Sequence, residues 1–306
     1  MQGRNIKAID NLRKGSYSKR QLLGILFIAP TVLFLAVFIL YPVLYNICLS
    51  FTNAKLMKST TSFVGLENYK KLFTSTVFPK YLWNTVTWTV FSVIGQLLLG
   101  FGFALLINRK NMRFGTAFRS FLLIPYVVPA VALALVTKWI LNGDYGIAST
   151  WLQSLGLIDH RQSLLAMPGT AMTVLIIINI WRSYPFPMLI YWAALKGIDK
   201  ALYEAAYVDG AGRFQTFLHI TIPYLKEPTI VLAVLRIIWT ATYFDLIWMV
   251  TGGGPAGSTT HLPIMIYQAS FGTFQTGYAS AISVILGMLL FICVAFYVKN
   301  SVTSED

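Results

Sequence analysis

Long runs without any charged residue constrain this chain more than any other feature. No Asp, Glu, Lys or Arg occurs at positions 21–54, 81–108, 120–137 or 162–181, and the longest run covers 246–298. A helix that spans a bilayer needs about 20 predominantly apolar residues, so each run is long enough for a span or nearly so. Only 11% of the 306 residues are charged, whereas a soluble domain carries roughly 25%. We therefore predict an all-α, polytopic membrane protein that crosses the bilayer about six times.

The apolar runs give approximate bounds for six spans. We expect them at Leu22–Leu49, Leu82–Asn108, Phe118–Leu141, Pro168–Trp192, Pro228–Val250 and Tyr278–Val298. The first apolar run is far longer than the roughly 7–15 residues of a cleaved signal peptide, so we interpret it as a retained span. The segment His261–Ser270 is apolar but short, which is typical of a re-entrant or interfacial segment.

The distribution of basic residues predicts the orientation in the membrane. With the N-terminus inside, the cytoplasmic segments carry roughly twice as many Lys and Arg residues as the outer segments, as the positive-inside rule requires. We therefore expect a cytoplasmic segment at 1–21, a membrane domain at 22–300 and a cytoplasmic tail at 301–306. The net charge of +13 then reflects these flanks and indicates no nucleic-acid partner. Cys48 and Cys293 lie in apolar stretches, where we expect them to be small buried hydrophobic residues.

Prolines interrupt two of the predicted spans. Pro125 and Pro129 fall in the third span, and Pro185 and Pro187 fall in the fourth. Each proline removes a backbone hydrogen bond, and the freed carbonyl groups must be satisfied by neighbouring helices or by water. Such a helix either kinks to pack or lines a cavity. The fourth span is the better candidate for a cavity because Arg182 lies beside its prolines.

The loop between the fourth and fifth spans, residues 195–226, is the most informative segment. Asp199 is a favoured helix cap, Lys200–Asp209 has a helix-forming composition, and Gly210 is a natural stop. A second short helix is expected to end before Pro223. The pattern predicts a short amphipathic helix on the cytoplasmic face, which lies either in the lipid headgroup region or in the groove of a partner protein.

The same loop contains a spaced motif. It reads Glu204-Ala205-Ala206, three residues, Gly210, nine residues, then Ile220-Thr221-Ile222-Pro223. This resembles the EAA loop of ATP-binding-cassette importer permeases, except that Ile222 stands where the family pattern has leucine. Segments 27–30, 41–42, 244–248 and 251–255 are similar to those of carbohydrate permeases of the maltose and glycerol-3-phosphate type. Within that branch they resemble the first of two unlike permease subunits.

The resemblance implies a heteromeric importer. Besides this chain, the importer would contain a second, homologous permease subunit, two ATP-binding subunits that hold ATP and Mg, and an extracytoplasmic solute-binding protein. The coupling residues that it implies are Glu204, Ala205, Ala206, Asp209, Gly210, Ala211 and Pro223. This chain itself would bind no cofactor, and its sequence has no Gly-x4-Gly-Lys-Ser/Thr phosphate loop. His160, His219 and His261 are scattered and lack the spacing of metal ligands.

Ionisable residues within the spans indicate where a substrate would pass. Arg182, Arg236 and Asp245 are costly in a bilayer and should face a cavity or a partner. For the arginines we favour pairing within this set or snorkelling toward water, whereas for Asp245 pairing and cavity lining both stay open. Sugars are held by aromatic faces and polar groups. The candidate pathway residues are Asn179, Trp181, Tyr184, Trp239, Tyr243 and Asp245.

We therefore expect a subunit of the cell membrane that passes a sugar or oligosaccharide inward. The same machine could carry a polyamine, a phosphate ester or a metal chelate. An ion-driven secondary transporter is a second alternative, but such proteins often show inverted repeats, and no internal repeat is evident. A membrane-embedded enzyme would need a catalytic constellation, and none is found. The glycine-rich loop Thr251–Ser258 faces outside, where we favour a flexible turn over a closure of the pathway or a contact with the binding protein.

Overall fold

The computed structural model describes residues 22–302 except 59, 110–114, 157 and 159–161. Over these residues the chain is helical, with one isolated bridge between Thr52 and Phe63 and no strand. The predicted all-α class is thus confirmed. The segment 1–21, His160 and residues 303–306 lie outside the described part of the chain, so the expected cytoplasmic ends stay predictions.

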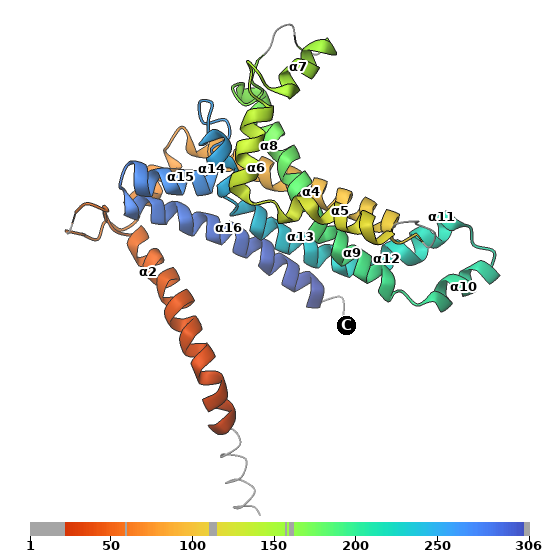
Figure 1. Ribbon diagram of the computed structural model, residues 1–306. Helices are drawn as coiled ribbons and strands as arrows, with labels where there is room; N and C mark the ends of the chain where they lie inside the picture. The colour runs from red at the N-terminus through yellow and green to blue at the C-terminus, as the bar shows by residue number, and fades with distance from the viewer. Residues whose placement is uncertain (1–21, 59, 110–114, 157, 159–161, 303–306) are drawn as a thin grey trace, which may run out of the picture.

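The described elements follow the predicted order (Figure 1). After the first helix they are α3 (Glu67–Phe73), α4 (Phe78–Ile107), α5 (Gly115–Val127), α6 (Ala130–Ile140), α7 (Ile147–Ser154), α8 (Pro168–Ser183), α9 (Pro185–Gly197), α10 (Lys200–Val208), α11 (Arg213–Thr216), η2 (Phe217–Thr221), α12 (Ile222–Tyr224), α13 (Lys226–Ala241), α14 (Asp245–Thr251), α15 (Leu262–Tyr267), η3 (Gln268–Gly272) and α16 (Thr276–Val302). Short helices α10 and α11 project at one end of the spans, and α7, α14 and α15 lie toward the other (Figure 1).

Six stretches are long and apolar enough to cross a membrane when each bent pair of helices counts as one span. They are Leu22–Ser50, Phe78–Ile107, Ala117–Val127 with Ala130–Ile140, Pro168–Ser183 with Pro185–Gly197, Lys226–Thr251, and Thr276–Tyr297. Each overlaps one predicted span. The charge-free runs therefore located the spans to within a few residues.

The first span stands apart from the other helices. It runs from Leu22 to Ser50 through η1 (Ala36–Leu40) and α2 (Tyr41–Ser50), and none of its most apolar 18-residue window is buried. Its end packs against α16, while its beginning diverges from the bundle (Figure 1). Cys48 on this helix and Cys293 on α16 are exposed free thiols. The prediction that both cysteines are buried is wrong, because each lies on a face that the other helices leave uncovered.

Three spans are broken, and two of the breaks occur at prolines. The third span bends by 89° between α5 and α6, where Pro129 caps α6 with an extended ψ of 142°. The fourth span bends by 43° between α8 and α9, where Pro185 is the first residue of α9. The fifth span is interrupted at 242–244, between α13 and α14. Proline at a helix start loses no hydrogen bond, which explains why the chain breaks at these positions.

Helix α4 is the centre of the bundle. It packs against α8, α9, α13 and α15, and its fully buried Trp88 donates a hydrogen bond from Nε1 to the Thr240 carbonyl at 2.8 Å. Helix α15 and the buried Ala269 of η3 pack within an apolar cluster with α16. The segment His261–Ser270 is therefore a short packed helix. The polar side of α4, which faces α8 and α13, leads to the site described next.

Candidate functional site

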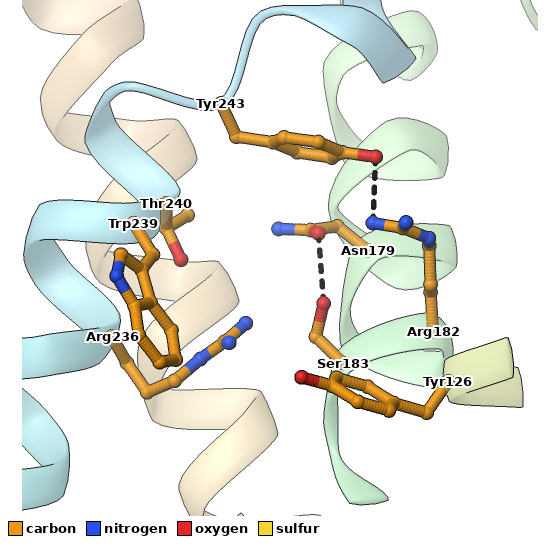
Figure 2. A pocket seen from close by; sticks show the side chains of 8 residues that line it. All are labelled: Tyr126, Asn179, Arg182, Ser183, Arg236, Trp239, Thr240 and Tyr243. Atoms are coloured by element: carbon orange, nitrogen blue, oxygen red, sulfur yellow. Dashed lines mark hydrogen bonds between the residues drawn. The ribbon is translucent and has the colours of Figure 1, made fainter. Parts of the chain in front are cut away.

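A cavity of about 380 Å³ lies where the three broken spans meet. Its walls are Tyr126, Asn179, Arg182, Ser183, Arg236, Trp239, Thr240 and Tyr243 (Figure 2). The volume falls within the roughly 300–1,000 Å³ of small-molecule sites. Irregular backbone at membrane depth is tolerated where it is buried in protein or lines a cavity, so the breaks and the cavity belong together.

The last turns of α8 supply one wall. Asn179, Arg182 and Ser183 lie three and four residues apart, which places them on one helix face. Arg182 donates from Nη1 to the Tyr243 hydroxyl at 2.6 Å, and its guanidinium lies 5.2 Å from the centre of the same ring. Ser183 donates to Asn179 Oδ1 at 3.3 Å. The amide nitrogen of Asn179 is thereby directed into the cavity (Figure 2).

Helix α13 supplies the opposite wall. Arg236 is only 6% exposed, and its Nε donates to Gln96 Oε1 on α4 at 2.7 Å. One turn further, Trp239 and Thr240 face the same space (Figure 2). Trp239 stacks edge-on against Phe186 with ring centres 5.2 Å apart. The wall therefore combines a buried cation with an aromatic surface.

Several polar atoms around this space have no hydrogen-bond partner within the described part of the chain. They are Asn179 Nδ2, Arg182 Nε and Thr240 Oγ1 on lining residues, and Gln96 Nε2 beside Arg236. A buried polar group without a partner costs roughly 1–3 kcal/mol, so a native site with several such groups calls for an explanation. A polar ligand or water in the cavity would satisfy them.

Only half of the predicted pathway residues line the cavity. Asn179, Trp239 and Tyr243 do, whereas Trp181 projects from a neighbouring face of α8 and is 44% exposed. Tyr184 is buried, and its hydroxyl donates to the Leu122 carbonyl at 2.9 Å, so it holds α5 against the bend. Asp245 is exposed at the start of α14 and lies outside the cavity.

The two arginines occupy positions that the sequence did not assign to them. We expected Arg182 and Arg236 to pair with Asp245 or to snorkel, yet both line the cavity and their hydrogen-bond partners are neutral. Tyr126, Ser183 and Thr240 were missed altogether. One sequence signal was present for Ser183, which lies one helical turn from Asn179 on the same face.

The loop between the fourth and fifth spans forms the helix that its sequence predicts. Asp199 caps α10 by accepting a hydrogen bond from the Ala201 amide at 3.0 Å, and Gly210 takes a left-handed φ of +79° just after the helix. The Tyr203 hydroxyl lies 3.0 Å from Thr221 Oγ1 and ties α10 to η2. None of the residues of α10 is buried.

The residues of the spaced motif are mostly accessible. Glu204, Ala205, Asp209 and Gly210 are exposed, and Ala206 and Ala211 are half-buried beside a shallow groove that also involves His219. Tyr207 and Val208 are 81% and 85% exposed. We had expected the second helix to end before Pro223, but it does not. It continues through a π-turn, η2, into α12, where Pro223 is the second residue and costs no hydrogen bond.

The glycine-rich loop after α14 is tied down on its inner side. Asn84 on α4 donates from Nδ2 to the carbonyls of Gly257 and Thr260 at 3.1 and 2.8 Å. Lys80 donates to the Ala256 carbonyl at 2.8 Å. Residues 258–261 are buried. The favoured interpretation of this loop as a flexible turn does not agree with these contacts.

Among the described residues, no group of three His, Cys, Asp or Glu side chains is placed to hold a metal ion.

Comparison with known proteins agrees with this architecture. Residues 96–303 match the model of the family described as "Binding-protein-dependent transport system inner membrane component". The chain is 35% identical to the sulfoquinovosyl glycerol transport system permease protein SmoG of Agrobacterium fabrum, over 91% of this chain and 90% of that protein. It is 32% identical to the trehalose/maltose transport system permease protein MalF of Thermococcus litoralis, over 95% and 97% of the two chains.

Solved structures share the fold. A chain from the crystal structure of a bacterial ABC transporter that imports the acidic polysaccharide alginate superimposes with a TM-score of 0.81 at 24% identity, covering 94% of this chain and 98% of the other. A second structure, the alginate transporter in complex with its pentasaccharide-bound periplasmic protein, gives 0.79 at 24% identity, covering 91% and 93%. The overall fold of this chain is therefore shared with solved ABC transporter chains.

Proposed function

We propose, from the premise that this chain belongs to the family of binding-protein-dependent transport system inner membrane components, that it is a permease subunit of an ATP-driven importer. The family makes it a transport component rather than an enzyme. Its relatives are named for sulfoquinovosyl glycerol and for trehalose and maltose, which supports a sugar or oligosaccharide as the substrate. The remaining subunits would be a second permease, two ATP-binding subunits that hold ATP and Mg, and an extracytoplasmic binding protein.

The exposed helix α10 is the observation that carries this proposal. It stands at one end of the spans (Figure 1), and its side chains at Tyr207 and Val208 are almost fully exposed. Apolar side chains left open on a short helix favour docking to a partner. We assign this partner to an ATP-binding subunit, with Glu204 and Asp209 placed to meet its basic groups. The loop is then cytoplasmic, and six spans put both chain ends on the same side.

The cavity supplies the substrate pathway in this proposal. Asn179 and Arg182 on α8 face Arg236 and Trp239 on α13 (Figure 2). Discontinuous helices near the middle of a membrane form the substrate sites of many transporters. A sugar ring would stack on the partly exposed Trp239 ring while the amide and guanidinium groups bind its oxygen atoms. Trp181, Tyr184 and Asp245 do not line this cavity, and their part in the pathway stays a prediction.

A copurification experiment tests the coupling role of α10. The complete transporter is expressed with Glu204→Lys or Val208→Asp, and with Glu67→Lys as the matched control. Glu67 is an exposed acidic residue on α3, which packs against α16. We expect the two α10 variants to lose the ATP-binding subunit and the vanadate-sensitive ATP hydrolysis, while the two permease subunits stay together. If both α10 variants retain the subunit as fully as Glu67→Lys does, α10 is only a surface helix and the proposal fails.

A further inference from the structure

We propose that the substrate bound in the cavity between α8 and α13 carries a negative charge, as a sugar with a carboxylate, sulfonate or phosphate group does. The inference rests on the proposed function, since it names the substrate class of that same cavity. It goes beyond a generic sugar site because neutral sugars need no compensating cation. Three properties of the cavity lead to it: its charge, its unpaired donors and its aromatic wall.

The cavity carries two positive charges and no negative one. Arg182 and Arg236 both line it, and no Asp or Glu is among its lining residues. Asp245 is close enough to act electrostatically on Tyr243, but it is exposed and does not line the cavity. A buried charge within a membrane protein is expensive unless it is paired. Two guanidinium groups that face one cavity also repel each other, so the cavity favours an anion.

The partners that the arginines do have are neutral. Arg236 bonds through Nε to the amide oxygen of Gln96, and Arg182 bonds through Nη1 to the phenol of Tyr243. Each of these contacts uses one of the five N–H donors of a guanidinium. The guanidinium of Arg236 extends into the space between α13 and α8, and that of Arg182 stands beside the Tyr243 hydroxyl (Figure 2). A guanidinium fork matches the oxygen pairs of carboxylate, sulfonate and phosphate groups in a bidentate fashion.

The other unpaired polar atoms include further donors. Asn179 is 1% exposed, and its Nδ2 has no hydrogen-bond partner among the described residues. Gln96 Nε2 is unpaired in the same way, because Gln96 gives its oxygen to Arg236. Both atoms can only donate. An excess of donors in a buried site selects a ligand that is rich in acceptors, and an anionic oxygen group has the most acceptors and no proton to offer.

An aromatic wall borders the charged part of the cavity. The rings of Tyr126 and Phe186 stack at 6.4 Å, and Phe186 meets Trp239 edge-on at 5.2 Å. Tyr126 and Trp239 both line the cavity, and they are 49% and 45% exposed. Aromatic faces of this kind suit the apolar face of a sugar ring. The cavity thus combines a ring platform with an anion site, which is the pattern of an acidic sugar.

Uptake of matched oligosaccharide pools by cells that express the complete transporter tests this inference. One pool is neutral. Three others carry the same oligosaccharides modified at C6 as uronate, sulfonate or phosphate, and mass spectrometry detects the internalised sugar. The variants are Arg236→Gln and Arg182→Gln, which remove the charge and keep hydrogen-bond donors, and Arg236→Lys, which keeps the charge. Lys138→Gln is the matched control, since Lys138 is exposed on α6 and does not line the cavity.

We expect wild-type cells to take up at least one anionic pool about tenfold or more faster than the neutral pool. In each glutamine variant, uptake of that anionic pool should fall by about the same factor, which corresponds to one charge-assisted hydrogen bond. Arg236→Lys should recover part of the loss, and Lys138→Gln should match wild type. ATP-dependent uptake that prefers the neutral pool would overturn the inference and leave the importer intact. An equal loss of all pools in the glutamine variants, or uptake of no pool by an assembled complex, would overturn it too. Uptake without any ATP dependence would instead refute the proposed function.

Discussion

Replacing Gly100 with alanine should disrupt the closest approach between two helices of the bundle. Gly100 lies on α4, where that helix crosses the start of α9. A Cβ atom at this position would lie 2.8 Å from Pro187 Cβ and 2.9 Å from the Met188 backbone nitrogen. It would also lie 3.0 Å from the Tyr184 carbonyl oxygen. Backbone and proline ring atoms cannot rotate away, so α4 and α9 must move apart.

The expected cost follows from the nature of this contact. Inserting a methyl group into a packed core that cannot relax costs about 1–3 kcal/mol, which is a factor of roughly 5–150 in the folded-to-unfolded ratio. Unfolding of the purified protein in mixed micelles, titrated with sodium dodecyl sulfate, measures this change. Small residues at helix contacts are how membrane helices approach closely, so the same change should also loosen the bend in the fourth span.

Gly102→Ala is the matched control for this prediction. Gly102 lies on the same helix, two residues later, and a Cβ there would meet nothing within 4 Å. We expect Gly102→Ala to leave the unfolding midpoint unchanged or to raise it slightly, because alanine is the better helix former. If Gly100→Ala and Gly102→Ala shift the midpoint by the same amount, the packing of α4 on α9 is not as close as described and the reasoning is refuted.

Two further predictions concern the ends of the bundle. Tyr203→Phe removes the hydroxyl contact with Thr221 at 3.0 Å. It should lower the stability of α10 against local unfolding by about 0.5–1.5 kcal/mol and speed amide hydrogen exchange in that helix. Tyr207→Phe, at an 81% exposed site, is the control and should change neither. Asn84→Ala removes two hydrogen bonds to the loop at 252–260, although the Gly257 carbonyl keeps the Thr260 amide as a donor at 3.3 Å. The loss should cost about 1–3 kcal/mol and raise proteolytic cleavage of that loop; unchanged cleavage would show that other contacts hold it.

The sequence was sufficient for the spans and for α10, because both depend on local properties. A span needs only length and low charge, and charges mark its ends. Helix α10 needs a cap, a stop and helix-forming residues between them, and Asp199 and Gly210 occupy those positions as predicted. The same local reasoning was wrong for Pro223, before which we expected the second short helix to end. A π-turn upstream lets the helix re-form with the proline in its first turn, and the composition gives no sign of that.

The cavity could not be predicted from the sequence, because it depends on where the helices break and on which face each helix turns toward its neighbours. The side chains of Trp181 and Arg182 are neighbours in the chain, yet only Arg182 reaches the cavity. Tyr184 has the composition of a sugar-binding residue, but the bend turns its hydroxyl to the Leu122 carbonyl. Asp245 is only two residues beyond Tyr243, but it follows the interruption at 242–244 and begins a new helix, α14. Periodicity counted through such a break assigns the wrong face.

The breaks also explain how a site in the membrane is connected to a loop beyond it. From the bend at Tyr184, α9 runs 13 residues to Gly197, and α10 begins at Lys200. From α12, helix α13 runs 16 residues to Ala241, just before Tyr243. These helices are about 20 and 24 Å long at 1.5 Å per residue, and each is unbroken. One leads from the loop at 195–226 to the wall that contains Arg182, and the other leads from the same loop to the wall that contains Arg236. A displacement of the loop therefore reaches both walls through stiff segments, and the breaks at their far ends are where the two walls can part.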